Sequence, residues 1–516
     1  MQETASVTFP TDEVAAQDTV RNHKYWRGFF QDVVQEYGYR PLQVEGQLPE
    51  MLNGTYYQNG PANFSSHGKT LGHIFTGDGL IRSVRLQQGK AEGAVKIIDS
   101  VGRQRERAAG KPLYDEHGGL LWQKGYRMER VKGLLTGELP FLNAGNTNIL
   151  PWQDQLLALY EADLPTALSP DNLETLGTTT LDGSIIGPFS AHPHWVSERQ
   201  CGYNFGVRSA GQNTWLDVYT LPAKGPCRLI TSVKLDRRCV GYIHDFMATP
   251  NYLVFFVPPM HASMGDLLNV AFGASPFDMS QWDASLGTEV IVVPIDKPEQ
   301  VIRFSTDPFF VIHHANGYEE NGKIVLNYIR SVDHSLYRQL GDIHRGLPVT
   351  YLKETYPGLW DGSDAFNRLT RSEIDLQQRS MDHQILADVY SEFPRINPGL
   401  QGSRHRYTYM LGTPPGKPEM PLFTTIEKFD AESGRTETLP LGDEQYPNEP
   451  IFIRKPGAAH EDAGYLLSVV YDGSEDNSYL AVVDAERFGD GVVAKVNFEQ
   501  ALPISFHGNW LSAAGD

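Results

Sequence analysis

The stretch PFFVIHHANGYEENGKIVLNYI, residues Pro308–Ile329, shows the type of structure that recurs along the chain. Its apolar run Phe309–Ile312 predicts a strand, which we expect to break at Ala315–Gly317. A second strand is expected over Lys323–Ile329, after a Glu-Asn-Gly turn. Turn chemistry of this kind between apolar and β-branched flanks predicts a β-hairpin.

Two adjacent histidines, His313 and His314, end the first of these strands. Because successive side chains of a strand point to opposite faces, only one of the two can face a given side. Taken alone, the pair indicates one buried, hydrogen-bonded histidine and one exposed histidine. A metal-binding role for either one requires ligands from elsewhere in the chain.

Short strands with turn formers between them dominate the 516 residues. The chain contains 49 Gly and 33 Pro, and its hydrophobic share of 40% is enough for a large core. Apolar strands such as Glu289–Ile295 and Gly464–Tyr471 recur from about residue 40 onwards, while long amphipathic helices are nearly absent. We therefore expect an all-β propeller, because radial closure protects strand edges. We expect residues 1–38 to form a polar, partly helical extension with an aromatic anchor at Tyr25–Phe30, and residues 39–516 to form a single unit.

The charge and the cysteines limit the possible partners and compartment. A net charge of −19 argues against nucleic-acid binding, which needs clustered Lys and Arg. Three cysteines without CxxC spacing fit a reducing cytosol. The N-terminus lacks a signal-peptide pattern, and the most apolar run, Tyr252–Pro258, is too short to span a bilayer. We expect a soluble or peripheral protein.

Residues 259–285 form an apolar insertion between predicted strands. One interpretation is a lid that packs over the core. The other is a surface for a lipid bilayer or the mouth of an apolar substrate site. The apolar residues that carry the second interpretation are Leu267, Leu268, Val270 and Phe272.

Four predicted strand ends carry a histidine between small or apolar residues and a turn former. These histidines are His192, His244, His313 and His507. They lack local zinc-type spacing such as HExxH, so a shared site would have to be assembled by the fold. In a propeller, the inner strands of successive blades face the central axis and would bring such residues together.

Three glutamates, Glu161, Glu392 and Glu449, lie in comparable apolar surroundings. A carboxylate there is costly unless it is paired or hydrogen-bonded. Metal-bound histidines usually donate their second ring N–H to such a carboxylate, which fixes the tautomer. The alternative for each glutamate is a salt bridge to a nearby arginine, and for any one of them alone this alternative is favoured.

Taken together, the motifs resemble those of the carotenoid cleavage oxygenase family. This family includes carotenoid, apocarotenoid and lignostilbene dioxygenases and the retinal pigment epithelium isomerase. The resemblance covers nearly the whole chain. The matching motifs include VEGQLP (44–49), HIFTGDG (73–79), LLALYEADLPTAL (156–168), AHPH (191–194), HDFMATPNY (244–252), FFVIHHANGYEENG (309–322), NEPIFI (448–453), EDAGYLLSVVYD (461–472) and FHGNW (506–510).

The resemblance implies a seven-bladed β-propeller with a mainly helical dome and an Fe(II) ion on its axis. The implied iron ligands are His192, His244, His313 and His507. Three of them are oriented by Glu161, Glu392 and Glu449. Thr147 matches a position that partly screens one open site on the iron, and His314 is a neighbour rather than a ligand. Four neutral imidazoles leave open positions for O₂.

The implied reaction is the cleavage of a conjugated C=C bond by O₂, with aldehyde or ketone products. Family members that cleave phenolic stilbenes place a lysine just before the first glutamate, where this chain has Tyr160. The difference favours an apolar polyene, a carotenoid or an apocarotenoid. The insertion 259–285 matches a hydrophobic, membrane-touching entrance, so the expected location is cytoplasmic and peripheral to a membrane. The alternatives are a stilbenoid dioxygenase, an isomerase and a non-catalytic binding propeller.

Overall fold

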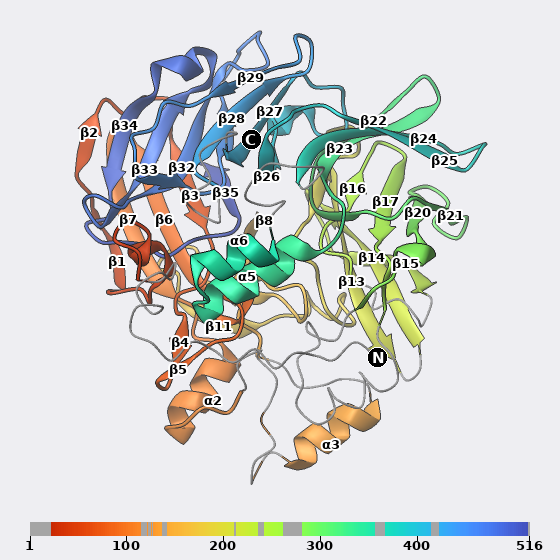
Figure 1. The fold of residues 1–516 in the computed structure, drawn as a ribbon, viewed down its shortest axis with the longest axis horizontal. Helices are drawn as coiled ribbons and strands as arrows, with labels where there is room; N and C mark the ends of the chain where they lie inside the picture. Colours follow the sequence, from red (N-terminus) through yellow and green to blue (C-terminus); the bar gives the residue numbers. More distant parts are fainter. Residues whose placement is uncertain are drawn as a thin grey trace.

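The computed structural model describes residues 22–114, 121, 125, 127–136, 142–210, 213–235, 242–261, 281–356, 367–413 and 423–513. Within this part, seven antiparallel sheets of four to six strands are arranged as blades in a ring (Figure 1). The predicted seven-bladed β-propeller is confirmed. Two small two-stranded sheets, β4–β5 (Ser65–Ser66, Lys69–Thr70) and β18–β19 (Met260–His261, Gln281–Trp282), lie outside the blades.

The first three blades use the N-terminal half of the chain and the last strand. Blade 1 contains β1 (Tyr37–Pro41), β7 (Lys90–Ile97), β6 (Leu80–Gln87), β3 (Gly54–Gln58) and β35 (Gly508–Ser512). Blade 2 contains β8 (Asn148–Trp152), β9 (Gln155–Leu159), β10 (Thr166–Leu168) and β11 (Thr175–Thr178). Blade 3 contains β12 (His194–Val196), β13 (Cys201–Ala210), β14 (Asn213–Pro222) and β15 (Arg228–Leu235).

The other four blades follow in chain order. Blade 4 contains β16 (Met247–Ala248), β17 (Tyr252–Val257), β20 (Thr288–Pro294) and β21 (Ile302–Thr306), and blade 5 contains β22 (Phe310–Glu320), β23 (Lys323–Ser331), β24 (Arg368–Asp375) and β25 (Ser380–Ile385). Blade 6 contains β26 (Tyr390–Arg395), β27 (Tyr407–Thr413), β28 (Thr425–Asp430) and β29 (Arg435–Thr438). Blade 7 contains β30 (Gln445–Pro447), β31 (Ile451–Arg454), β32 (Gly464–Asp472), β33 (Asn477–Asp484), β34 (Val492–Asn497) and β2 (Val44–Gly46).

The ring is closed by strands from both ends of the chain. The C-terminal strand β35 pairs with β3 of blade 1, and the N-terminal strand β2 pairs with β34 of blade 7. Closure leaves no open gap between the first and last blades, which protects strand edges. It also places the FHGNW motif beside the N-terminal blade, so that His507 reaches the axis.

Burial follows the position of a strand within its blade. β17, with the sequence YLVFFV, is apolar along its length and almost entirely buried, because sheets pack on both of its faces. β25, the last strand of blade 5, has the sequence SMDHQI and is mostly exposed. The blades therefore pack around a core, and the inner strands hold the residues that face the axis.

The hairpin at residues 308–329 differs in one respect from the prediction. Its turn is as expected, since Asn321 and Gly322 both adopt positive φ (53° and 77°), the conformation of a tight hairpin turn. The expected break at Ala315–Gly317 is wrong, because β22 continues through these residues to Glu320. Two register shifts, on either side of His314, absorb the irregularity without ending the strand.

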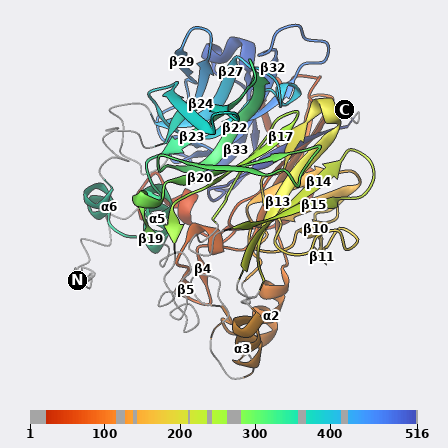
Figure 2. The same cartoon turned by 90° about the vertical axis from the view of Figure 1, so that its right-hand side faces the viewer.

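Helices and the N-terminal segment cover parts of the ring. Helices α5 (Ser335–Arg345) and α6 (Val349–Thr355) lie in front of the ring in Figure 1, and Figure 2 shows them at the left side of the sheets. Helices α2 (Val101–Ala109) and α3 (Arg127–Thr136) lie below the sheets in both views. None of the described helices is long and apolar enough to cross a membrane.

The predicted aromatic anchor packs against blade 7. Trp26 and the 3₁₀ turn η1 (Arg27–Phe30) contribute three aromatic rings to the buried core, and the Trp26 indole donates to Tyr446 Oη (2.7 Å). The Phe29 ring stacks on that of Tyr471 at 5.8 Å. Strand β1 begins at Tyr37, and the division into residues 1–38 and 39–516 stays a prediction.

Candidate metal centre

Each blade contributes one of the four predicted ligands or three predicted ligand-orienting glutamates. In blade order these are His507, Glu161, His192, His244, His313, Glu392 and Glu449. His192, His244 and His507 lie one to three residues before the first residue of β12, β16 and β35, and His313 lies within β22. The inner strands of successive blades converge on the axis. His192 and His507 therefore come into contact, with their rings 4.5 Å apart, although they are 315 positions apart in sequence.

The four histidines form a buried group able to hold a metal ion. One ring nitrogen from each lies within 4.8 Å of the corresponding nitrogens of the others. Nε2 of His244 is 2.9 Å from Nε2 of His192 and 3.3 Å from Nε2 of His313. Ligand nitrogens at ~2.1 Å from a metal and about 90° apart are separated by roughly 3.0 Å, so these spacings fit a shared ion.

Three carboxylates fix the tautomers of three of these histidines. His244 Nδ1 donates to Glu161 Oε2 (2.5 Å), and His507 Nδ1 donates to Glu449 Oε1 (2.9 Å). His313 Nδ1 donates to Glu392. An ionised carboxylate only accepts, so each Nδ1 carries the hydrogen and each Nε2 presents a lone pair to the axis.

Converging lone pairs favour a cation between the rings. Two imidazole nitrogens that both lack hydrogen cannot bond to each other, so the 3.3 Å contact of His244 with His313 is unfavourable without a positive charge between them. Burial lowers the pKa of His192 and His507, and it lowers that of His313 to about 4. Burial also lowers the pKa of His244, but the charge and hydrogen bond of Glu161 outweigh it and the net shift is upward. Neutral imidazole is the metal-binding form.

His192 is held in a different way. Its backbone N–H donates to Ser190 Oγ (3.1 Å), which in turn contacts the His244 carbonyl (3.4 Å). Within the described ranges, no hydrogen bond joins His192 to a carboxylate. Carboxylates thus hold three of the four rings, and His192 is the fourth.

Arg395 was not singled out from the sequence. Its guanidinium makes a two-pronged ion pair with Glu449, Nε to Oε1 (2.8 Å) and Nη2 to Oε2 (3.0 Å). Burial alone would raise the pKa of Glu449, but Arg395 and His507 hold it at about 2. The alternative reading of this glutamate, a salt bridge to arginine, therefore applies together with its contact to His507. The available signal was an arginine three residues after Glu392 in the same strand.

His314 points away from the four-histidine group, as strand alternation predicts, but the expectation of one exposed histidine is wrong, because His313 and His314 are both buried. Its backbone N–H donates to Asp245 Oδ2 (2.6 Å), and its Nδ1 lies 3.2 Å from the same oxygen. Asp245 Oδ1 accepts from His194 Nε2 (2.7 Å). Asp245, which the sequence reasoning missed although it follows His244, therefore links the inner strands of blades 3, 4 and 5.

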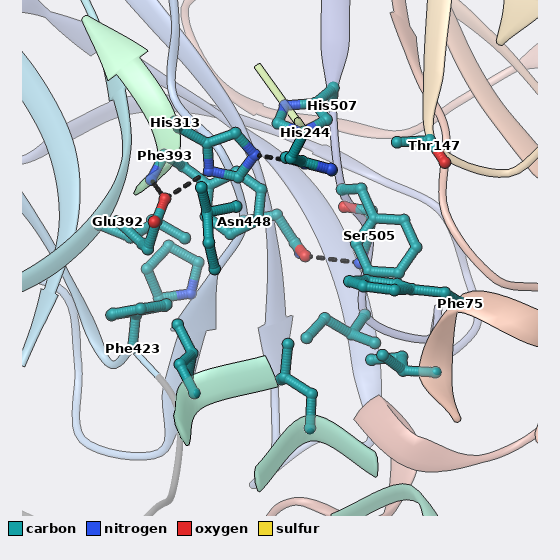
Figure 3. Close-up of a pocket in the computed structure, with 18 of the residues that line it drawn as sticks. Phe75, Thr147, His244, His313, Glu392, Phe393, Phe423, Asn448, Ser505 and His507 are labelled. Atoms are coloured by element: carbon teal, nitrogen blue, oxygen red, sulfur yellow. Dashed lines mark hydrogen bonds and ion pairs between the residues drawn. The ribbon is translucent and has the colours of Figure 1, made fainter. Parts of the chain in front are cut away.

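An apolar pocket opens beside the histidines (Figure 3). Its apolar walls come from η1, the η2 turn (Ile74–Thr76), α5 and the inner strands, and they include Phe29, Phe75, Leu336, Leu340, Phe393, Leu411, Phe423 and Phe506. Three of the four histidines line it, together with Glu392. Mostly apolar walls with a few converging polar groups are typical of a small-molecule site.

Thr147 lines this pocket and lies directly before β8. Its Oγ1 contacts Asn146 Oδ1 (3.2 Å), and its carbonyl accepts from the His507 N–H (3.2 Å). Figure 3 shows Thr147 across the site from Glu392. Leu267, Leu268, Val270 and Phe272, the predicted entrance residues, lie outside the described residues.

Comparison with known proteins agrees with this geometry. The family model described as Retinal pigment epithelial membrane protein matches residues 30–512. The apocarotenoid-15,15'-oxygenase of Synechocystis sp. is 30% identical, over 98% of this chain and 99% of that protein. An isoeugenol monooxygenase of Pseudomonas nitroreducens is 26% identical, over 91% of this chain and 94% of that protein.

A solved relative shares the whole architecture. The crystal structure of cobalt-substituted Synechocystis ACO superposes with a TM-score of 0.80 at 27% identity, and covers 95% of this chain and 99% of that one. The family match spans nearly the whole chain, and the seven blades and their closure agree with it. The chain therefore belongs to the Retinal pigment epithelial membrane protein family, the family of carotenoid cleavage oxygenases.

Proposed function

We propose that the protein is a non-haem Fe(II) dioxygenase that cleaves a conjugated C=C bond of a carotenoid or apocarotenoid, with O₂ as co-substrate and aldehyde or ketone products. One observation carries the proposal. Four buried histidines form one group, and the three of them that are held by carboxylates line an apolar pocket. A metal centre beside an apolar pocket suits a substrate without charge.

His192, His244, His313 and His507 are the proposed iron ligands. Their donor set, four imidazoles without a carboxylate ligand, suits a borderline divalent ion such as iron. When bound, Fe(II) supplies the activation of O₂. The cobalt-substituted form of the Synechocystis relative supports a metal site in this fold.

The remaining residues have supporting roles. Glu161, Glu392 and Glu449 orient three ligand rings and keep their Nε2 lone pairs directed at the axis. Thr147 lies on the pocket wall across the site from Glu392, where it limits the space beside the ligands. The aromatic walls exclude water and position an extended conjugated chain.

The polyene substrate is favoured over a phenolic one by Tyr160. Burial raises the pKa of this phenol, so Tyr160 is neutral. Members of the family that cleave phenolic substrates have a lysine at this position, and Tyr160 does not supply that positive charge. The Synechocystis relative is named as an apocarotenoid oxygenase. The isoeugenol monooxygenase relative is the specific observation that favours a second candidate, cleavage of a phenolic alkene or stilbenoid.

We also propose that the segment 259–285 brings the enzyme to a membrane surface on the cytoplasmic side. A polyene partitions into bilayers, and the segment carries several apolar residues with little charge. The proposal concerns peripheral contact only.

A substrate panel tests the proposed function. Purified, iron-loaded protein is offered apocarotenals of graded length and, in parallel, resveratrol-like stilbenes and isoeugenol. Mass spectrometry identifies the carbonyl products. We expect cleavage of apocarotenals with little turnover of the phenols. Preferred cleavage of the phenols would establish the second candidate, and no O₂ consumption with any substrate would favour a non-catalytic propeller.

A further inference from the structure

Strand β26 of blade 6 has an irregularity beside the four histidines. Its residue Glu392 pairs with Leu411 of β27. Arg395, three residues later on β26, pairs with Tyr409, which is only two residues from Leu411. Strand β26 therefore has one residue more than its partner over this stretch, which is a β-bulge. The bulge contains Phe393, whose φ is 54°.

The backbone of Phe393 is strained. A φ of this sign is the left-handed region, which is open to glycine and costly for a bulky residue, because Cβ comes too close to the carbonyl oxygen. Bulges with a left-handed residue usually have glycine there. Pro394 follows directly, and proline favours an extended backbone in the residue before it. Strain of this kind persists only where the surrounding structure holds it, and it is concentrated at functional sites.

The bulge is tied to the groups that orient the histidines. The Phe393 N–H donates to Glu392 Oε2 (2.7 Å), and the same oxygen accepts from His313 Nδ1. At the other end of the bulge, Arg395 makes its two-pronged ion pair with Glu449. Both ends of the irregular stretch are therefore held by buried, charged hydrogen bonds.

The bulge also changes which side chains share a face of the strand. In a regular strand, residues an odd number of positions apart point to opposite faces. Glu392 and Arg395 are three positions apart, yet both act on the histidine group. Glu392 contacts His313 directly, and Arg395 contacts Glu449, which accepts from His507. The extra residue in the bulge accounts for this shared direction.

The Phe393 ring lies against two of the four histidines. Its centroid is 4.9 Å from that of His313 and 5.2 Å from that of His507, and these two imidazoles are themselves 4.6 Å apart. A hydrogen bond at Nδ1 directs an imidazole but leaves its plane free to tilt about that bond. A packed aromatic ring restricts the tilt. In Figure 3, Phe393 lies on the same side of the site as His313 and Glu392.

We propose that Phe393 is a positioning residue of the metal centre. Its ring fixes the planes of His313 and His507, and its left-handed backbone places Glu392 and Arg395 where they orient the same two ligands. The inference rests on the proposed function, and it adds a residue that acts on the metal through the ligand rings. A role in the pocket wall alone would leave metal binding independent of this side chain.

The test uses Co(II) as the probe metal, because its visible absorption reports on the geometry of its ligands. Metal-free protein is titrated with Co(II) against a competing chelator, and affinity, spectrum and unfolding temperature are recorded. The proteins are the wild type, Phe393→Ala, Phe393→Gly, Phe393→Tyr and Phe423→Ala. Phe423 is a matched control, because it lines the same pocket and its ring lies 6.5 Å from that of Phe393. Among the described residues it makes no ring contact with the four histidines.

We expect Phe393→Ala and Phe393→Gly to bind Co(II) about tenfold more weakly than the wild type, with altered spectra. Phe393→Tyr keeps a ring and Phe423→Ala keeps Phe393, so both should retain the affinity and the spectrum of the wild type. Unchanged affinity and spectra in Phe393→Ala and Phe393→Gly would overturn the proposal.

Unfolding temperatures test the role of the backbone. Glycine adopts a positive φ without steric cost, so Phe393→Gly should unfold at no lower temperature than Phe393→Ala. The reverse order would overturn the role assigned to the left-handed backbone. Phe393→Gly also keeps the metal titration decisive if Phe393→Ala does not fold.

Failure of the proposed function gives a different result. A wild type that binds no Co(II) would overturn the metal centre, and with it both the proposed function and this role of Phe393. A wild type that binds Co(II) but, when loaded with iron, cleaves no polyene would refute the proposed function alone. Weaker Co(II) binding by Phe393→Ala would then still support its positioning role.

Discussion

Replacement of the two adjacent histidines, one at a time, separates the metal site from the fold. His313→Ala removes an imidazole nitrogen from the four-histidine group and leaves Glu392 without its ring partner. Loss of a residue that only orients a ligand costs 10–100-fold in metal affinity, so loss of the ligand itself should cost more. We expect less than about a tenth of an iron ion per chain after purification, with full loss of cleavage.

His314→Ala should act on stability instead. The ring packs on Phe256 at 5.6 Å, and its Nδ1 contacts the buried carboxylate of Asp245. Loss of a buried ring and of a hydrogen bond to a charged group costs roughly 3–5 kcal/mol. At about 2.1 cal/mol/K per residue, a chain of 516 residues unfolds with an entropy of roughly 1.1 kcal/mol/K, so Tm should fall by about 3–5 °C.

Two assays distinguish the variants. Elemental analysis of proteins purified in parallel gives iron per chain, and scanning calorimetry gives Tm. The expected pattern is iron lost in His313→Ala and retained in His314→Ala, with lower stability in the latter. If His314→Ala loses its iron as fully as His313→Ala, or if His313→Ala keeps it, the assignment of the two rings is wrong.

Three further predictions concern the ligand-orienting groups and the insertion. Glu392→Gln replaces the carboxylate that accepts from His313 with an amide. Iron affinity, measured by competition titration, should then fall about 10–100-fold. Unchanged affinity would show that Glu392 does not orient His313. Arg395→Met leaves Glu449 buried without its cation, which should lower the free energy of unfolding by roughly 3–5 kcal/mol in urea denaturation. A loss below ~1 kcal/mol would show that His507 alone suffices for this carboxylate. The insertion is tested by replacing Leu267, Leu268 and Phe272 with serine. This variant should no longer co-sediment with liposomes. Unchanged binding to liposomes would reject the membrane contact.

Much of the fold follows from local sequence. Apolar strands with turns between them predict the blades, and Asn321-Gly322 predicts the hairpin turn. The expected break at Ala315–Gly317 was wrong because small and polar residues there are accommodated by bulges within a strand that is paired along its length. Local propensity does not contain this tertiary pairing.

The local sequence predicts the site less well than the fold, because the site residues come together only when the ring closes. His507 and His192 belong to blades 1 and 3, and no local spacing links them. The family resemblance supplied the grouping that spacing alone did not. Arg395 and Asp245 escaped notice because their roles depend on partners in other blades, Glu449 in blade 7 and His314 in blade 5.

The most direct test of the central claim is the dependence of cleavage on iron occupancy. Metal-free protein is reconstituted with increasing Fe(II), and in parallel with Zn²⁺, and the carbonyl products from an apocarotenal are quantified under O₂. The account predicts no cleavage without iron, a rise that ends at about one Fe(II) per chain, and no activity with Zn²⁺. Cleavage by the iron-free protein, or activity that does not follow iron occupancy, would contradict it.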